Sequence, residues 1–446
     1  MEHQYYEIFP KPINDQSHSL YLIQCPSAII FSMLSLYLHI PFCAHRCAYC
    51  DFNTYAGQEG LIPAYVDALR NEIRAAGEGT GSPRRVGTVF FGGGTPSLLT
   101  VPQFESILQT ISTHFELVQD AELTFEANPG TVSADGLARL RQAGMNRISF
   151  GVQSANAEEL HMLERTHSFP DVINAVKWAR QADFDNLNLD LIYALPEQTL
   201  QTWQTTVERV VALHPEHLSL YALTLEHGTP FGRWASRGLL PLPDPDLAAD
   251  MYEWAAAFLT EQGYVQYEIS NWAVDKGDHR PLTVDRDIPS TVHRPPSGSC
   301  RHNLQYWRNL DYLGLGAGAH GYAAGIRYSN VLRIKTYIER LSLSPIPNSQ
   351  STNFPYPLTP ATVNHHKNTP REDMQETMMT GLRLTGEGVS ANVFQTRFGV
   401  ALTDAFGKEI NELLGLGLLE WAGESLRLSE RGRLLGNQVF MRFVGE

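Results

Sequence analysis

Apolar residues in the first half of the chain recur at two alternating spacings. Runs such as Val86–Phe91 and Leu187–Tyr193 are short and rich in β-branched and aromatic residues, which predicts buried strands. Segments such as Leu61–Ala76 instead place their apolar residues on one helical face. Six strand–helix units in succession, up to Leu223, predict a parallel sheet with helical crossovers. Such a sheet curls into a barrel, or it stays open and doubly wound.

The pattern changes towards the C-terminus. Helical faces are followed by two short strand-like runs around Gly423, which predicts a winged-helix-like unit over residues 372–446. The predicted elements are helices at Met374–Leu384, Val389–Phe398 and Thr403–Leu414, a hairpin of Leu418–Ala422 and Ser425–Leu428, and a final helix from Glu430.

Polar segments without periodicity divide the rest of the chain. Residues 273–300 and 344–371 are rich in polar residues and proline, which predicts surface loops or disorder. They separate an α/β unit at 35–272 from an ordered segment at 301–343. Residues 1–34 lack the basic leader of a secretory signal, so we expect them to form a disordered extension.

The composition narrows the classes of function. The net charge of −14, with no basic tract, argues against a nucleic-acid-binding protein. No run is long and apolar enough to cross a bilayer. Five cysteines in 446 residues do not make a disulfide framework, and three of them lie within eight residues, which favours metal binding. Exposed thiolates and a cluster need a reducing compartment, which is the cytoplasm or an organelle matrix, and we expect the protein in the cytoplasm.

Polar residues gather where the predicted strands end. Glu126, Gln153 and Asp190 lie at or just after the carboxyl ends of three predicted strands, and a glycine run containing Gly93 follows another. The loop Cys43–Cys50 follows the first strand. In parallel α/β barrels this rim binds ligands, so we expect these features to form one site.

The three clustered cysteines suggest an iron–sulfur site. Cys43, Cys47 and Cys50 can hold three corners of a four-iron cluster, which leaves one iron open to another ligand. Zinc is the alternative, and it would need a fourth ligand such as His39 or His45.

The cysteine spacing together with Gly-Gly-Gly-Thr-Pro resembles the signature of the radical S-adenosylmethionine (radical SAM) superfamily. The resemblance implies a partial parallel (β/α)6 TIM-like barrel, a [4Fe-4S] cluster, SAM bound to the open iron and an electron donor for the cluster. The residues that match the superfamily's SAM contacts are Tyr37, Gly93, Gly94, Thr95, Glu126, Gln153, Arg165, Asp190 and Ala222.

Longer motifs resemble one branch, the coproporphyrinogen-oxidase-like proteins. They include YLHIPFC, FGGGTPS, ISFGVQS and YEISNWA. The oxygen-independent coproporphyrinogen III oxidases of this branch carry a fourth cysteine where this chain has Phe52. The HemW group, which the resemblance identifies as haem chaperones, has phenylalanine there and an HNxxYW motif, here His302–Trp307. The resemblance therefore implies haem as cargo and recipient haem proteins as partners. Oxidative decarboxylation of coproporphyrinogen III stays as the alternative, and whether the chain is an enzyme is left open.

The HNxxYW motif contains the candidate haem-binding residues. A neutral imidazole such as that of His302 is a common axial ligand of haem iron, and Tyr306 and Trp307 offer flat apolar surface. The alternative is a hydrogen-bonded histidine beside two core aromatic residues. His320 and Cys300 are further candidate ligands. The sequence does not fix the oligomeric state, and a homodimer is compatible with it.

Overall fold

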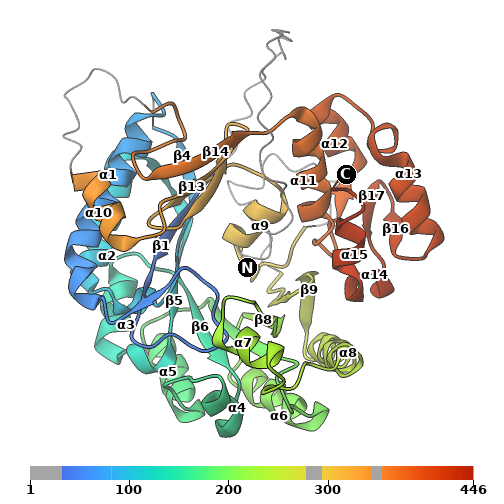
Figure 1. The fold of residues 1–446 in the computed structure, drawn as a ribbon, viewed down its shortest axis with the longest axis horizontal. Helices are drawn as coiled ribbons and strands as arrows, with labels where there is room; N and C mark the ends of the chain where they lie inside the picture. Colours follow the sequence, from blue (N-terminus) through green and yellow to red (C-terminus); the bar gives the residue numbers. More distant parts are fainter. Residues whose placement is uncertain (1–32, 82, 278–293, 343–353, 445–446) are drawn as a thin grey trace.

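The computed structural model describes residues 33–81, 83–277, 294–342 and 354–444. One large curved sheet organises the molecule (Figure 1). Its twelve strands lie in the order β14 (Thr362–Lys367), β13 (Ile326–Asn330), β12 (His320–Ala323), β11 (Tyr312–Leu315), β1 (Leu34–Ile40), β4 (Arg85–Gly93), β5 (Glu116–Ala127), β6 (Arg147–Gln153), β7 (Leu187–Tyr193), β8 (His217–Ala222), β10 (Asn271–Val274) and β9 (Tyr264–Glu268). The strands from β11 to β8 are parallel neighbours. The predicted parallel barrel is therefore confirmed.

Helices cover the convex face of the parallel strands (Figure 1). They are α1 (Ile62–Glu78), α2 (Val101–His114), α3 (Ala134–Gln142), α4 (Ala157–Met162), α5 (Phe169–Gln181) and α6 (Leu200–Val211). Successive side chains of a strand point to opposite faces, so Leu123 and Phe125 of β5 share one face. Both pack against these helices. The Phe125 ring lies 5.8 Å from Phe104 of α2. The apolar half of each strand thus builds the core between sheet and helices.

The concave face of the same strands is polar. Its side chains hydrogen-bond across strands, as between Thr88 and Ser35 at 2.7 Å and between Asn188 and Ser149 at 2.8 Å. We call these residues the interior polar layer: Ser35, Thr88, Glu122, Thr124, Arg147, Ser149, Asn188, His217 and Ser219, all buried. Branched apolar residues usually fill such barrels, so this interior is built for a polar network.

Two antiparallel extensions of the sheet correct the sequence analysis. Residues 344–371 were expected to be a surface loop, but 362–367 form the edge strand β14, which pairs with β13. Its residues are mostly exposed and show no apolar alternation, so no strand pattern was visible. The strands β9, β10, β11, β12 and β13 were also missed, because each has only four or five residues. Residues 1–32 and most of the loop predicted at 273–300 lie outside the described residues.

The C-terminal unit has a core of its own. It contains α11 (Pro370–Gly381), α12 (Ala391–Phe398), α13 (Leu402–Gly415) and a three-stranded sheet of β15 (Val389–Ser390), β17 (Ser425–Leu428) and β16 (Leu419–Ala422). The predicted hairpin is confirmed, with Gly423 at a positive φ of 62° in its turn. Two predictions were wrong. Val389 and Ser390 belong to a strand rather than to the next helix, and the final helix is two short ones, α14 (Glu430–Leu434) and α15 (Gly436–Phe440).

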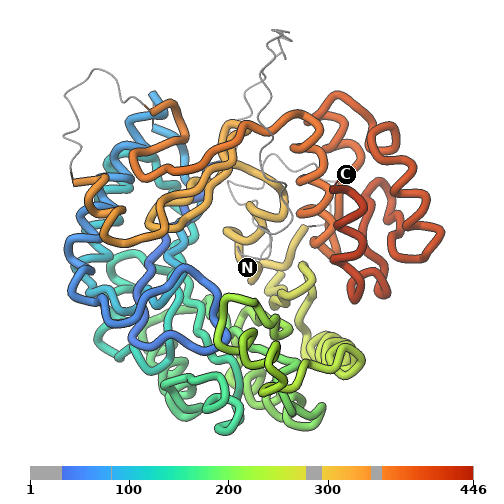
Figure 2. Tube along the Cα trace, viewed as in Figure 1, coloured from blue at the N-terminus to red at the C-terminus, as the bar shows by residue number. Residues whose placement is uncertain are grey.

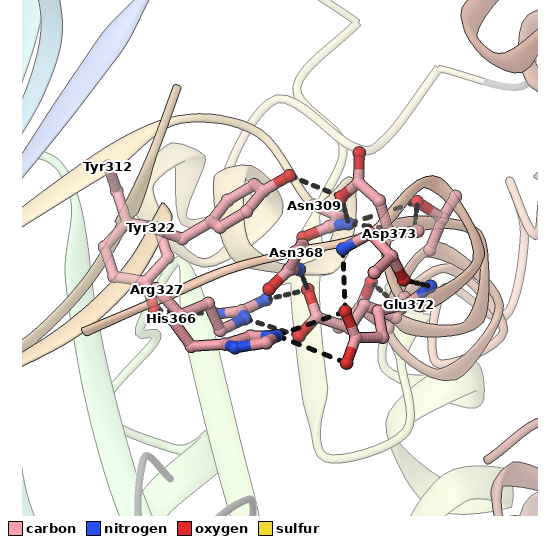
Figure 3. Close-up of polar contacts among 12 residues, drawn as sticks. Asn309, Tyr312, Tyr322, Arg327, His366, Asn368, Glu372 and Asp373 are labelled. Atoms are coloured by element: carbon pink, nitrogen blue, oxygen red, sulfur yellow. Dashed lines mark hydrogen bonds and ion pairs between the residues drawn. The ribbon is translucent and has the colours of Figure 1, made fainter. Parts of the chain in front are cut away.

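The C-terminal unit is tied to the extended sheet through α11 (Figure 3). Arg327 of β13 donates to both carboxylate oxygens of Glu376, at 2.6 and 2.7 Å. Asp373 accepts hydrogen bonds from Tyr322 of β12 and from Asn309. In Figure 2 this unit, drawn in red, lies on the side of the sheet away from the first helices. None of the described helices is both long and apolar enough to span a membrane.

Candidate functional site

The cysteine loop projects from the carboxyl end of β1. Cys43 ends the short strand β2 (Phe42–Cys43), which pairs with β3 (Tyr55–Ala56) on the far side of the loop. Cys47 and Cys50 lie between these strands, and the Cys50 amide donates to the Cys47 carbonyl at 3.1 Å. The pairing of β2 with β3 fixes both ends of the loop and keeps the three thiols together.

Each thiol has a different polar neighbour. The contacts are Thr95 Oγ1 to Cys43 Sγ at 3.7 Å, Arg165 Nη1 to Cys47 Sγ at 3.6 Å, and Thr54 Oγ1 with Cys50 Sγ at 4.0 Å. Burial raises the pKa of Cys43 and also that of Cys50, the latter to about 11. Both thiols are therefore protonated at neutral pH in the metal-free chain, and binding of iron would release their protons.

The donor set suits a cluster better than a single metal ion. Among the described residues, no three His, Cys, Asp or Glu side chains are grouped so that they could hold one ion. A four-iron cluster makes a different demand, since each of its thiolates binds its own iron. His39 and His45, the expected fourth zinc ligands, are both engaged. His39 bonds Tyr37 and the Asn53 carbonyl, each at 3.0 Å, and His45 pairs with Glu164 at 3.2 Å.

The glycine run at the end of β4 packs directly on the cysteine loop. The amide of Gly94 donates to the Ile40 carbonyl at 2.9 Å. A Cβ at Gly94 would lie 2.5 Å from the Phe42 carbonyl oxygen, and one at Gly93, whose φ is 111°, would lie 2.5 Å from the His39 ring. Only glycine permits this approach. The run therefore positions the loop, and it forms the rim next to the thiols.

The other predicted SAM contacts lie at two depths in the barrel, some at the carboxyl ends of the strands and one further inside. Glu126, near the end of β5, accepts a hydrogen bond from the Gly93 amide at 3.0 Å. Gln153 ends β6 at a positive φ of 68°, and Ala222 ends β8. Asp190, by contrast, lies in the middle of β7 and not at its end, so its placement at the rim was wrong. Ser149 donates to it at 2.7 Å, which joins it to the interior polar layer.

Arg165 connects the rim to the cysteine loop. Besides its contact with Cys47, it donates to the carbonyl of Gly151 in β6 at 2.9 Å. Its Nε atom is buried and has no hydrogen-bond partner within the described chain. A guanidinium held beside a thiol in this way can receive a carboxylate, which agrees with the expected contact to SAM.

The HNxxYW motif lies deeper in the barrel. It forms most of α9 (Arg301–Trp307), which covers the amino-terminal end of the parallel strands. His302 is 1% exposed, and its ring stacks on Phe90 at 5.1 Å. Its Nδ1 bonds Thr88 Oγ1 at 2.6 Å, and its Nε2 bonds the Tyr306 hydroxyl at 2.8 Å.

These contacts set the protonation of His302. Burial, and then the nearby Arg147, lowers its pKa to about 3, so the imidazole is neutral at physiological pH. A neutral imidazole is the form that binds haem iron. Ligation by Nε2 requires loss of the Tyr306 contact, however. Trp307 is buried beneath the Arg383 guanidinium, 4.5 Å from its ring centre, and presents no free face.

The structure does not bring the motif and the rim together. His302 sits beside Thr88, which is four residues before Gly92 along β4, or about 13 Å at 3.3 Å per residue. Tyr37 lies between the two levels, with ring centres 5.9 Å from His39 and 6.4 Å from His302. The two candidate sites are thus the upper and lower levels of one barrel interior.

The sequence analysis missed the residues that fix α9. The Glu122 carboxylate accepts from the amides of Arg301 at 2.9 Å and His302 at 3.0 Å. The Tyr267 hydroxyl accepts from the amide of Cys300, the residue before α9, at 3.3 Å, and it bonds His217 at 2.7 Å. The only available signal was a polar residue inside an apolar strand, which does not identify its partner.

Comparisons with known proteins agree with this architecture. The model of the radical SAM superfamily matches residues 37–210, and that of the HemN C-terminal domain matches residues 368–435. A solved structure titled as coproporphyrinogen III oxidase (HemN) from Escherichia coli, a radical SAM enzyme, superposes with a TM-score of 0.74 at 25% identity. It covers 92% of this chain and 90% of that one.

Curated relatives match almost the whole chain. The heme chaperone HemW of Bacillus subtilis (strain 168) is 36% identical over 415 residues, which are 93% of this chain and all of that protein. HemW of Escherichia coli (strain K12) is 34% identical over 93% of this chain and 98% of its own length. A mitochondrial radical S-adenosyl methionine domain-containing protein 1 of Mus musculus is 35% identical over 89% of this chain and 84% of its own length. The chain therefore belongs to the HemW family of the radical SAM superfamily.

Proposed function

We propose that the protein is a haem chaperone of the cytoplasm, which binds haem and delivers it to haem-dependent proteins. The observation that carries this proposal is the similarity, over nearly the full length of both chains, to proteins named heme chaperone HemW. Phe52, where the oxidases of this branch carry a fourth cysteine, adds to it.

The rim would hold the cofactors that the superfamily implies. Cys43, Cys47 and Cys50 would bind a [4Fe-4S] cluster, and SAM would occupy its open iron. When bound, this pair supplies one-electron cleavage of SAM. The residues proposed to contact SAM are Tyr37, Gly93, Gly94, Thr95, Glu126, Gln153, Arg165, Asp190 and Ala222. Their task is to orient the sulfonium and to exclude water, whereas an electron donor reduces the cluster.

Haem delivery is tested by transfer. The haem-loaded protein is mixed with an apo haem enzyme, and the recipient's Soret spectrum and activity are followed. We expect transfer faster than haem release into buffer containing a haem scavenger. Transfer no faster than release would contradict a chaperone role.

The part played by His302 has a sharper test, because Tyr306 competes for its Nε2 atom. If His302 ligates the iron, His302→Ala weakens haem binding and changes the Soret band, while Tyr306→Phe strengthens binding by freeing Nε2. The exposed His365→Ala serves as a matched control and leaves both unchanged. An unaltered spectrum in His302→Ala would remove this residue from the haem site.

Coproporphyrinogen III oxidation is the second candidate, favoured by the HemN structural match. It is tested anaerobically with reconstituted protein, SAM, a reductant and coproporphyrinogen III. We expect no turnover to protoporphyrinogen IX. Several turnovers per chain would overturn the proposal of a chaperone without this activity. In the same preparations, Cys43→Ala, Cys47→Ala and Cys50→Ala should each lose the iron–sulfur chromophore.

A further inference from the structure

One charged side chain of the interior polar layer has no hydrogen-bond or ion-pair partner among the described residues. Arg147 is the first residue of β6 and is 2% exposed. Within the part of the chain that the structure describes, its guanidinium makes no hydrogen bond or ion pair, and its Nε atom is fully buried. Burying an unpaired charge is costly, and arginine cannot lose its proton in a protein.

A second unpartnered polar atom lies beside it. The hydroxyl oxygen of Thr124, a residue that is 0% exposed, also has no hydrogen-bond partner among the described residues. Thr124 and Arg147 are paired directly opposite each other on β5 and β6. Both point to the concave face, so a hydroxyl and a guanidinium without partners are neighbours on that face.

The nearby acidic groups are already satisfied by other donors. Glu122 accepts from the amides of Arg301 and His302, and Asp190 accepts from Ser149 and Asn188. Both carboxylates act on Arg147 through space, but neither approaches it closely enough to form an ion pair. Among the described residues, the guanidinium donors of Arg147 therefore have no acceptor, which leaves them available to a ligand.

The geometry of the guanidinium selects the ligand. Its planar fork matches the two oxygens of a carboxylate, and a hydroxyl beside it can donate a further hydrogen bond. We propose that Arg147 and Thr124 bind a propionate carboxylate of the tetrapyrrole cargo inside the barrel. This inference rests on the proposed function, since it specifies how that cargo is held.

The carboxylate of SAM is the competing ligand, and distance argues against it. The amino acid end of SAM would lie on the open iron at the rim, beside Arg165 and Cys47. Arg147 lies four residues before Gly151 on β6, which corresponds to about 13 Å along the strand. The Gly151 carbonyl accepts the hydrogen bond from Arg165. The backbone of Arg147 therefore lies well below the point where Arg165 is held.

The test compares haem with its dimethyl ester, in which both propionates lose their charge. Affinities are measured for the wild-type protein and for Arg147→Gln, Arg147→Lys and Thr124→Val. We expect the wild type to bind haem about tenfold or more tightly than the ester. Arg147→Gln should bind haem only as well as the ester, with the ester affinity unchanged. Arg147→Lys should keep part of the preference, and Thr124→Val should lose a smaller part of it.

Several outcomes would overturn the inference. Equal wild-type affinity for haem and ester would do so, and so would an equal loss for both ligands in Arg147→Gln, which would indicate a structural counter-ion. Loss of SAM binding in Arg147→Gln with the haem preference intact would assign the residue to SAM. If Arg147→Gln does not fold, the near-isosteric Thr124→Val decides. Absence of any haem binding to wild type would instead refute the proposed function itself.

Discussion

Gly94 shows how a single missing side chain shapes the rim. Its amide bonds the end of β1, and its Cα lies against the Phe42 carbonyl at the start of the cysteine loop. A methyl group at this position has to push β4 and the loop apart. The Gly-Gly-Gly-Thr-Pro motif is therefore needed to place the thiols even before any ligand binds.

We predict that Gly94→Ala lowers the free energy of unfolding by about 1–3 kcal/mol, as overpacking does, and reduces the cluster content after reconstitution. Urea denaturation and the visible absorbance of the cluster measure the two effects. Gly60→Ala is the control, because a Cβ there has no atom within 4 Å. A Gly94→Ala protein with wild-type absorbance would contradict the close packing.

His217 makes the fold sensitive to acid. It is fully buried, and burial, and then Arg147, holds its pKa well below the usual value. Below about pH 6.5 the unfolded chain takes up a proton at this residue and the native chain does not. Stability due to His217 is therefore present above that pH and is lost as the pH falls.

The predicted consequence is a change in the slope of the free energy of unfolding against pH. From about pH 6.5 downward, the free energy of unfolding should fall up to about 1.4 kcal/mol per pH unit more steeply in the wild type than in His217→Gln. Urea titrations of the metal-free protein between about pH 5 and 8 measure this difference. Identical slopes would mean that the native His217 also binds a proton.

The sequence predicted some residues of the candidate site and missed others. The three cysteines and the glycine run were found because their spacing is itself the signal. Glu122 and Arg147 were missed, because their meaning depends on where α9 and β5 meet, and α9 is about 180 residues further along the chain than Glu122. Asp190 was identified, but its depth in the strand was misjudged.

Among the elements, α9 is the connection between barrel and C-terminal unit. Its first amides bond Glu122 of β5, and its last aromatic residue, Trp307, lies under Arg383, which follows α11. Arg383 in turn pairs with Glu268 of β9, which is 0% exposed. The motif's tryptophan thus contributes to the contact between the two units.

We predict that Arg383→Met destabilises the protein by about 3–5 kcal/mol, because it leaves the buried Glu268 charge without its cation. The matched control is Arg427→Met, which breaks a partly exposed pair with Glu420 and should cost about 0–1 kcal/mol. Urea denaturation measures both. Equal costs would show that burial of the Glu268 pair adds nothing.

The regular α/β alternation predicted the six parallel strands from β1 to β8 and their helices, but not the parallel strand β11, which lies outside that alternation. The strand at 187–193 was predicted to the residue. The strands β12, β13 and β14 at one end of the sheet were not, because β12 and β13 are short, β14 is mostly exposed, and all three owe their structure to pairing in series from β11 and to contacts with α11. Their stability comes from partners that a local pattern does not contain.

For the whole molecule, three largely buried arginine–glutamate pairs join the two units. They are Arg327–Glu376, Arg383–Glu268 and Arg308–Glu387. Such pairs lose much when one unit unfolds alone, since each then leaves a buried charge unpaired. The units are therefore coupled although each has its own hydrophobic core.

We predict that the wild-type protein unfolds in one cooperative transition. Trp421 is the one tryptophan after residue 371, so the fluorescence that is lost in Trp421→Phe reports on the C-terminal unit, and far-UV circular dichroism reports mainly on the barrel. The double variant Arg327→Met/Arg383→Met should separate the two curves. Separate transitions in the wild type would contradict the coupling.

The hydrogen bonds from the start of α9 to Glu122 also affect the order in which the barrel is completed during synthesis. The two partner amides of Glu122 are made about 180 residues after the carboxylate, which at about 5–20 residues per second is about 10–40 s of translation. The strands β6, β7 and β8 are made during this interval, and β1, β4 and the cysteine loop are made before it, so all of them exist before α9 can cover the lower end of the barrel. The nascent barrel therefore stays open to water at its base until synthesis has passed residue 302, and α9 is the element that closes it.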